Sequence, residues 1–247
     1  MSAFDRVGPL LRVLREPGGL RAARSWKPFS ITAFQLARSL RRQGLSPDLV
    51  IDGGANVGQF ARAMIETFPG AHVVSFEPLP EVAARFRGFF EWEPRVRLVE
   101  TALGASVGLL SFGRNEYSLA SSALPVVSGG DELVQPHLER IEVPVTTLDA
   151  ALSNREITTS TLLKLDLQGF ELEALRGAEA TLDRVGFVLL EIALSPSYQG
   201  EPTFGSLSNH LRPFGFQFLR PLDLLRAPSS GEILQMDALF GRVVDKT

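Results

Sequence analysis

The sequence predicts an α/β fold built on a mostly parallel sheet. Short apolar runs at 49–51, 73–76 and 96–99 alternate with stretches of helical periodicity, and a glycine-rich turn follows the first run. Strands and helices that alternate in this order are joined by right-handed crossovers. Ligands of such sheets lie at the carboxyl ends of the strands, where we expect the functional residues.

The composition is that of an ordinary globular protein. A length of 247 residues suits one α/β domain with a small extension, and 45% of the residues are apolar. The sequence has no cysteine, which excludes disulfides, thiolate nucleophiles and cysteine metal sites. Because no apolar run is long enough for a membrane span or a signal peptide, we expect a cytoplasmic protein.

We predict a basic helical N-terminal extension at 1–45 and the main domain at 46–247. The extension carries nine Arg or Lys and two acidic residues, a balance of +7 against −10 for the rest. An apolar stripe predicts one helix over 4–14, and Ser30 is the expected N-cap of a second helix that ends at Gly44. Such an arm can make peripheral contact with an anionic membrane, hold an acidic substrate or dock on a partner. The alternative, a packing element with solvated arginines, stays open.

The stretch Leu49–Gly58, LVIDGGANVG, predicts a buried strand, a tight turn and a helix N-terminus. A carboxylate at Asp52 would repel a dinucleotide pyrophosphate but attract the cationic amino group and sulfonium of S-adenosylmethionine. Glu77 ends the next strand, near the spacing at which nucleotide folds place an acid against ribose hydroxyls. The alternative is that Asp52 caps the helix and Glu77 is a solvated charge. A nicotinamide-dependent oxidoreductase is disfavoured, because the full GxGxxG pattern is missing.

After the third strand, the Thr101-Ala102 backbone is expected at the same rim. A short strand at 109–112 precedes a long stretch with little periodicity, which includes Tyr117, Ser121 and Gly129–Asp131. We interpret it as a substrate-facing lid, with a disordered surface excursion as the alternative. Pro144 predicts that the strand at 143–149 lies at a sheet edge, since proline cannot donate to a central ladder.

The second stretch rich in functional residues is Leu162–Glu171, LLKLDLQGFE. Lys164 and Asp166 lie two apart on an apolar strand and so on one side of the pleat. A lysine there is costly unless paired, and the expected partners are Asp166 or Glu171, although a purely structural ion pair stays open. One helix is expected from Phe170 through Leu182. The strand at 187–190 delivers Glu191, and 216–219 with 238–243 predict a closing antiparallel pair.

These residues resemble the FkbM-type S-adenosylmethionine-dependent methyltransferases. The resemblance rests on VIDGGANVGQF, SFEPLPEVAARF, ALG, PVTTLD, KLDLQGFELEALRGAE and FVLLEI, in this order over about residues 49–192. It implies a Rossmann-like class I methyltransferase fold, a seven-stranded sheet with a terminal antiparallel pair, and methylation of a hydroxyl on a sugar, glycan or natural product. One departure concerns position 168, where the family often has Glu and this chain has Gln168.

Together these observations predict the site residues. The predicted cofactor-binding residues are Asp52, Gly53, Gly54, Ala55, Asn56, Gly58, Glu77, Pro78, Ala102 and Asp166. The predicted catalytic residues are Asp166, Glu191 and Lys164, with Asp166 as general base, Glu191 as second candidate and His210 as third.

Other readings remain open at this point. No metal site is predicted, although Asp166, Glu171 and Glu191 offer hard oxygen ligands for a metal-assisted variant. The alternative function is a non-catalytic module of the same fold that binds a nucleotide-like ligand or a partner. Nucleic acid is not an expected partner, because the body is acidic. The sequence names neither the acceptor nor the oligomeric state.

Overall fold

The computed structural model describes residues 13, 16–115, 121–127, 138–227 and 230–242. The predicted helix at 4–14, apart from Val13, lies outside these residues, and so does much of the predicted lid, including Tyr117 and Gly129–Asp131. Within the described residues, no helix has the length and apolar character needed to cross a membrane.

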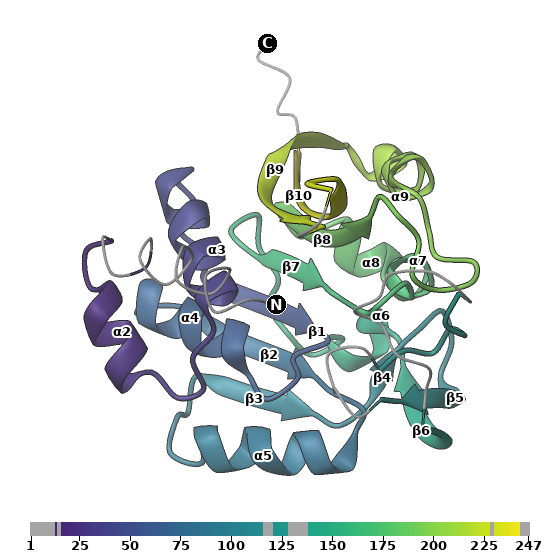
Figure 1. Cartoon of the computed structure of the whole chain (residues 1–247), viewed down its shortest axis with the longest axis horizontal. Coiled ribbons are helices and arrows are strands. Elements are labelled where there is room, and N and C mark those ends of the chain that lie inside the picture. The colour runs from purple at the N-terminus through teal and green to yellow at the C-terminus, as the bar shows by residue number, and fades with distance from the viewer. Residues whose placement is uncertain (1–12, 14–15, 116–120, 128–137, 228–229, 243–247) are drawn as a thin grey trace.

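The described strands form two sheets (Figure 1). The strands are β1 Leu49–Gly53, β2 His72–Phe76, β3 Val96–Val99, β4 Ala102–Leu103, β5 Gly108–Arg114, β6 Glu139–Thr146, β7 Leu162–Leu165, β8 Phe187–Ala193, β9 Phe216–Arg226 and β10 Ile233–Arg242. The larger sheet has the order β3-β2-β1-β7-β8-β10-β9, and only β10 runs antiparallel to its neighbours. This confirms the predicted seven-stranded, mostly parallel sheet. From β1 the chain adds β2 and β3 on one side and then returns to add β7 and β8 on the other side. Folds of this kind bind ligands at such a switch point in the strand order.

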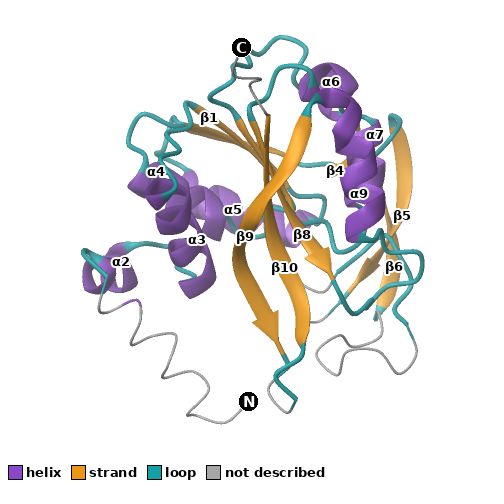
Figure 2. Ribbon diagram, turned by 90° about the horizontal axis from the view of Figure 1, so that it is seen from above, coloured by secondary structure: helices purple, strands orange, loops and turns teal. Residues whose placement is uncertain are grey.

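Helices cover both faces of the large sheet (Figure 2). They are α2 Gly19–Ser25, α3 Ile31–Arg42, α4 Gln59–Thr67, α5 Pro80–Phe90, α6 Leu148–Ala151, α7 Glu171–Arg176, α8 Glu179–Leu182 and α9 Phe204–Leu211. Val50 and Leu162 pack with α3, α4 and α5, whereas Ile51 and Leu163 pack with α6 to α9. Both faces of β1 and β7 are therefore buried, which is why these strands read as continuous apolar runs.

The N-terminal helix α3 begins where the sequence predicts. Ser30 Oγ accepts a hydrogen bond from Ala33 N at 3.3 Å, as expected of an N-cap. Ala37 and Leu40 are fully buried in the cluster that includes α4 and the sheet. The described part of the extension thus shares the core of the main domain, and the boundary at residue 45 stays a prediction.

The small sheet has the order β4-β6-β5, so the prediction that Pro144 lies on an edge strand was wrong for β6 as a whole. The physical reason is local. β4 pairs only with Val145 and Thr146, so Pro144 faces a partner on the β5 side alone. A proline is tolerated there because the ladder on the other side has not yet begun.

The single helix predicted from Phe170 through Leu182 is also wrong, because the structure has two short helices, α7 and α8. Gly177 lies at the break, where an added Cβ would come within 2.2 Å of the Gly104 carbonyl oxygen. Asp149 accepts hydrogen bonds from the backbone N–H groups of Ala180 and Thr181 and so starts the second helix.

The turn after β1 is fixed to the strands on both sides of it. Gly54 N and Ala55 N donate to the Phe76 carbonyl at 3.1 and 3.0 Å, and Asp166 N donates to the Gly53 carbonyl at 3.2 Å. Gly54 has φ +77°, and an added Cβ would lie 1.9 Å from the Asp166 carbonyl oxygen. Only glycine therefore lets the turn approach the end of β7.

We expect Gly54→Ala to lower the free energy of unfolding by about 2–4 kcal/mol, from left-handed strain and overpacking together. Gly70→Ala is the matched control, because a Cβ there meets nothing within 4 Å. Urea unfolding of both variants measures the difference. Equal stabilities would contradict the close approach of the two turns.

Candidate functional site

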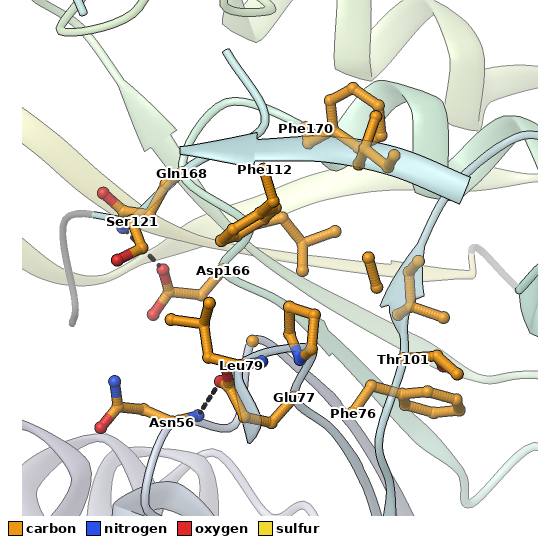
Figure 3. A pocket seen from close by; sticks show the side chains of 16 residues that line it. Asn56, Phe76, Glu77, Leu79, Thr101, Phe112, Ser121, Asp166, Gln168 and Phe170 are labelled. Carbon is orange, nitrogen blue, oxygen red and sulfur yellow. Dashed lines mark hydrogen bonds between the residues drawn. The ribbon is translucent and has the colours of Figure 1, made fainter. Parts of the chain in front are cut away.

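A cavity of about 610 Å³, partly open to solvent, lies at the carboxyl edge of the large sheet between the ends of β1 and β7. Figure 3 shows side chains from three places converging on it: the glycine turn, the end of β2 and the end of β7. The lining residues are Gly54, Asn56, Phe76, Glu77, Pro78, Leu79, Thr101, Ala102, Leu103, Leu110, Phe112, Ser121, Asp166, Leu167, Gln168 and Phe170.

Glu77 links the glycine turn to the segment after β2 at the edge of this cavity. Its Oε2 accepts from Asn56 N and its Oε1 accepts from Leu79 N, both at 3.0 Å (Figure 3). Asn56 has φ 49°, a conformation that asparagine tolerates better than most residues. Burial raises the pKa of Glu77 to about 7, although the two backbone hydrogen bonds oppose the shift. The carboxyl group thus changes charge near neutral pH.

A buried ion-pair triad of Asp52, Lys164 and Asp166 borders the cavity, and Asp166 lines it. Lys164 Nζ is 3.4 Å from Asp52 Oδ1 and 3.3 Å from Asp166 Oδ2. The side chain of Lys164 is 7% exposed and that of Asp52 is 0% exposed. Ser75 Oγ donates to Asp52 Oδ2 at 3.3 Å. Burial alone would lower the pKa of Lys164, but Asp166 and Asp52 raise it further than burial lowers it. Lys164 therefore stays charged, and the predicted pairing with Asp166 is present together with a second partner.

At the end of β7, Gln168 links two carboxylates. Its Nε2 donates to Asp166 Oδ1 at 3.0 Å and to Glu191 Oε2 at 2.9 Å. Burial raises the pKa of Asp166, but the Lys164 ammonium and the hydrogen bonds outweigh it and leave a net lowering. Burial and the nearby Asp166 raise the pKa of Glu191 well above its usual range. As the pH rises, Asp166 therefore loses its proton before Glu191 does.

The three carboxylates considered for a metal do not fit one. Glu171 Oε1 accepts from Leu167 N at 2.7 Å and from Gly169 N at 3.3 Å, so it is turned toward the backbone of the turn. The Gln168 amide nitrogen, a donor with no metal-binding lone pair, lies between Asp166 and Glu191. Among the described residues, no group of three or more His, Asp or Glu side chains is arranged to hold a metal ion.

The cavity includes six of the ten residues predicted to bind the cofactor: Gly54, Asn56, Glu77, Pro78, Ala102 and Asp166. Asp52 lies beneath the cavity instead, because its carboxylate is buried against Lys164 and Ser75. Gly53, Ala55 and Gly58 also lie outside the lining. Gly58 instead allows helix packing, since a Cβ there would come within 2.3 Å of the Phe90 ring.

The other predicted residues are also placed. Lys164 and Glu191 lie beside Asp166 but outside the cavity lining, whereas His210 is on α9 with its ring 6.0 Å from that of Phe214. His210 is therefore not a neighbour of the described site.

Sequence reasoning missed the part of the cavity wall that comes from the small sheet. Leu110 and Phe112 of β5 line the cavity, and their alternation on one face was the available signal. It also missed the Thr101 hydroxyl. Thr101 Oγ1 is buried without a hydrogen-bond partner among the described residues, so it is available to a ligand.

Comparison with known proteins gives a family match. The model of the methyltransferase FkbM domain matches residues 52–218, which include the glycine turn, Glu77, the Gln168 turn and Glu191.

Two curated relatives and one solved structure illustrate what this chain is similar to. The 2-O-methyltransferase NoeI of Sinorhizobium fredii is 28% identical over 167 residues, which span 63% of this chain and 68% of NoeI. The hexuronic acid methyltransferase AglP of Haloferax volcanii is 27% identical over 164 residues, which span 63% of this chain and 60% of AglP. A TehB-like SAM-dependent methyltransferase from Corynebacterium glutamicum is 14% identical, with a TM-score of 0.46 over 96% of this chain and 100% of that one.

We expect Asp52→Asn to lower the free energy of unfolding by about 3 kcal/mol. This is the low end for breaking a buried ion pair, because Lys164 keeps Asp166 as a partner. Glu66→Gln makes the same chemical change in a partly exposed pair with Arg62 and should stay within about 0.5 kcal/mol of wild type. Urea unfolding at neutral pH measures both, and a loss below about 1 kcal/mol for Asp52→Asn would show that Lys164 does not depend on it.

Proposed function

Because this chain belongs to the FkbM methyltransferase family, and is thus an S-adenosylmethionine-dependent methyltransferase, we propose that it methylates a hydroxyl oxygen of a sugar, glycan or natural product. The observation that carries the proposal is that the carboxylates of Asp166 and Glu77 line the same cavity at the carboxyl edge of the large sheet. The similarity to NoeI, a 2-O-methyltransferase, supports an oxygen as the acceptor atom, and the similarity to AglP, a hexuronic acid methyltransferase, supports a sugar-type acceptor.

The residues of the cavity fit the cofactor. Glu77 ends β2, where a carboxylate can accept hydrogen bonds from the ribose hydroxyls. The Thr101 hydroxyl has no partner among the described residues and can bond the adenine or ribose. Gly54 and Asp166 line the cavity together, and we place the methionine end of the cofactor beside them. When bound, S-adenosylmethionine supplies an electrophilic methyl group on a sulfonium.

The chain's own residues then have two tasks. The first is to hold the acceptor hydroxyl in line with the methyl group, because the displacement is governed by positioning. The second is to take the hydroxyl proton. As the C–O bond forms, this proton becomes strongly acidic, so even a carboxylate with a lowered pKa accepts it. We assign that role to Asp166, with Lys164 holding its Oδ2 and with Asp52 acting through Lys164.

The charges next to Asp166 favour a neutral acceptor. Glu191, Asp237 and Asp223 are successive partners across β8, β10 and β9, and all three line a second cavity of about 530 Å³. Burial and neighbouring Asp166 raise the pKa of Asp237 to about 7, as expected for crowded carboxylates. Such a surface binds hydroxyl and other donor groups and repels anions. We therefore propose a neutral polyhydroxylated acceptor over a uronic acid.

The proposal extends to location and partners. The acidic body supports the expectation that nucleic acid is not a partner, and the basic residues of 1–45 support peripheral contact with an anionic membrane. The cytoplasmic location predicted from the sequence stays a prediction.

Cofactor binding should depend on pH through Glu77. Ribose hydroxyls donate to the ionised carboxylate, so the Kd for S-adenosylmethionine should rise below about pH 7, approaching about tenfold per pH unit. Glu77→Gln should weaken binding and remove the pH dependence. Calorimetric titrations between about pH 6 and pH 8 measure this, with the exposed Glu81→Gln as control. A pH-independent Kd in the wild type would overturn the assignment of Glu77.

The proposed base is tested with S-adenosylmethionine labelled in its methyl group and a panel of neutral methyl glycosides and uronic acids. We expect transfer to a neutral glycoside, and we expect Asp166→Asn to lower kcat about 100-fold or more while the cofactor Kd is kept. Asp183→Asn, an exposed change after α8, is the control. Activity of Asp166→Asn within a few-fold of wild type would rule out Asp166 as base. Cofactor binding without transfer to any acceptor would favour the non-catalytic module.

A further inference from the structure

Gln168 occupies an unusual position, because its side-chain amide lies between the two carboxylates at the end of β7 and β8. We propose that Gln168 is the positioning residue that fixes Asp166 for proton removal, through the two N–H donors of its amide. The inference deepens the proposed function and rests on it.

The hydrogen bonds of the amide determine its orientation. An amide nitrogen carries two hydrogens, and Gln168 Nε2 directs them to Asp166 Oδ1 at 3.0 Å and Glu191 Oε2 at 2.9 Å. The Oε1 accepts from the Tyr198 hydroxyl at 3.1 Å. A flipped amide would place its carbonyl oxygen against the ionised Asp166, and the two oxygens would repel each other. The observed orientation is therefore the favoured one.

The backbone of Gln168 is held as firmly as its side chain. Its φ of 54° is in the left-handed region, which costs of order 1–3 kcal/mol for a non-glycine residue. Ser122 Oγ donates to the Gln168 carbonyl at 2.7 Å, and Glu171 Oε1 accepts from Gly169 N next to it. Such a conformation persists only where its surroundings fix it. Segments after β5 and β8, together with α7, thus all determine where the amide lies.

The consequence for Asp166 is that both of its oxygens are held. Lys164 Nζ contacts Oδ2 at 3.3 Å and Gln168 Nε2 contacts Oδ1 at 3.0 Å, from two sides. A carboxylate oxygen can accept a second hydrogen bond, so each oxygen can still receive one from a bound hydroxyl in the cavity. The plane of the carboxylate is therefore set before an acceptor arrives.

Without the amide donors, the balance of charge around Asp166 would change. The charged and titratable groups that face it come from all the packed elements: Lys164 of β7, Asp52 of β1, Glu191 of β8, Asp237 of β10, Glu171 of α7 and Tyr198 after β8. Lys164 is the only cation in this set. Asp166 and Glu191 also share a side-chain hydrogen bond. Without the N–H groups of Gln168, Asp166 would keep that bond and its contact with Lys164 but lose a donor that stabilises its ionised form, so Asp166 would be neutral over more of the working pH range.

Three variants separate positioning from simple space filling. Gln168→Met keeps the length and removes both donors, whereas Gln168→Glu keeps an acceptor for Tyr198 and replaces the donors with a negative charge. Tyr198→Phe is the matched control, since it removes only the hydroxyl that orients the amide. We expect kcat to fall about 100-fold in Gln168→Met, further in Gln168→Glu and a few-fold in Tyr198→Phe. The Kd for S-adenosylmethionine should stay that of wild type in all three.

The pH profile is the readout that a merely structural role would not move. In both Gln168 variants, the acidic limb of the pH profile of kcat should shift to higher pH, because Asp166 binds its proton more readily. Unchanged kcat and an unmoved limb in both variants would overturn the proposal. Should Gln168→Met fail to fold, the isosteric Gln168→Glu carries the test alone.

A second measurement needs no acceptor. In protein labelled with ¹³C at the aspartate carboxyl carbons, Asp166→Asn identifies the Asp166 signal. We expect this signal to titrate below the usual aspartate range in wild type and at higher pH in Gln168→Met. If wild type transfers methyl to no acceptor, the proposed function fails and this titration still decides the role of Gln168. An unmoved midpoint would overturn that role.

Discussion

The ammonium group of Lys164 is the constraint on which the rest of the site depends. A charge this deeply buried is tolerated only when it is paired, and the pairing comes from the register of the sheet. Asp52 lies directly opposite both Lys164 on β7 and Ser75 on β2, so the three side chains form one row on the same face. Asp166 follows two residues after Lys164 and so faces the same side. A slip of one residue between β1 and β7 would turn Lys164 and Asp166 to the other face and leave Asp52 unpaired. The positions of Lys164 and Asp166 at the carboxyl edge are therefore set by the pairing of the central strands and not by the loops.

Two buried glutamates fix the loops above this row. Glu77 accepts backbone hydrogen bonds from the glycine turn and from the segment after β2, and Glu171 does the same for the turn after β7. Burial raises their pKa values from 4.5 to about 7 and about 8. Because the folded state binds these protons more tightly than the unfolded chain, their contribution to stability is fully present below about pH 4.5. It is lost as the pH rises through about 7 and 8. The loops are thus held without a ligand, at some cost in stability at alkaline pH.

The sequence predicts those features that depend on residues close together in the chain, and it misses those that depend on contacts between distant segments. The strands, the glycine turn and the closing antiparallel pair follow from local periodicity and turn chemistry, and the carboxyl-end rule places Glu77 and Asp166 at one edge. The break between α7 and α8 and the inner position of β6 depend on contacts with distant segments, which periodicity does not contain. The burial of Asp52 also depends on a distant contact, because its partner Lys164 lies 112 residues later in the sequence. Gln168 gave no signal beyond its neutrality, because its partners Ser122, Glu191 and Tyr198 are 46, 23 and 30 residues away.

The position of Gln168 also explains why an amide suits this place better than other polar groups. Asp166 and Gln168 line the first cavity and Glu191 lines the second, so the hydrogen bond from Gln168 to Glu191 joins the linings of the two. A residue at this position must donate to a carboxylate on each side and accept from Tyr198 above them. A lysine could donate but not accept, an ionised glutamate could accept but not donate, a protonated one has a single donor, and methionine offers no strong donor or acceptor. The planar amide meets all three needs in fixed directions. In-line transfer tolerates little displacement of the reacting groups. Through the Gln168 amide, segments that are distant in the sequence together determine the geometry of the single carboxylate of Asp166.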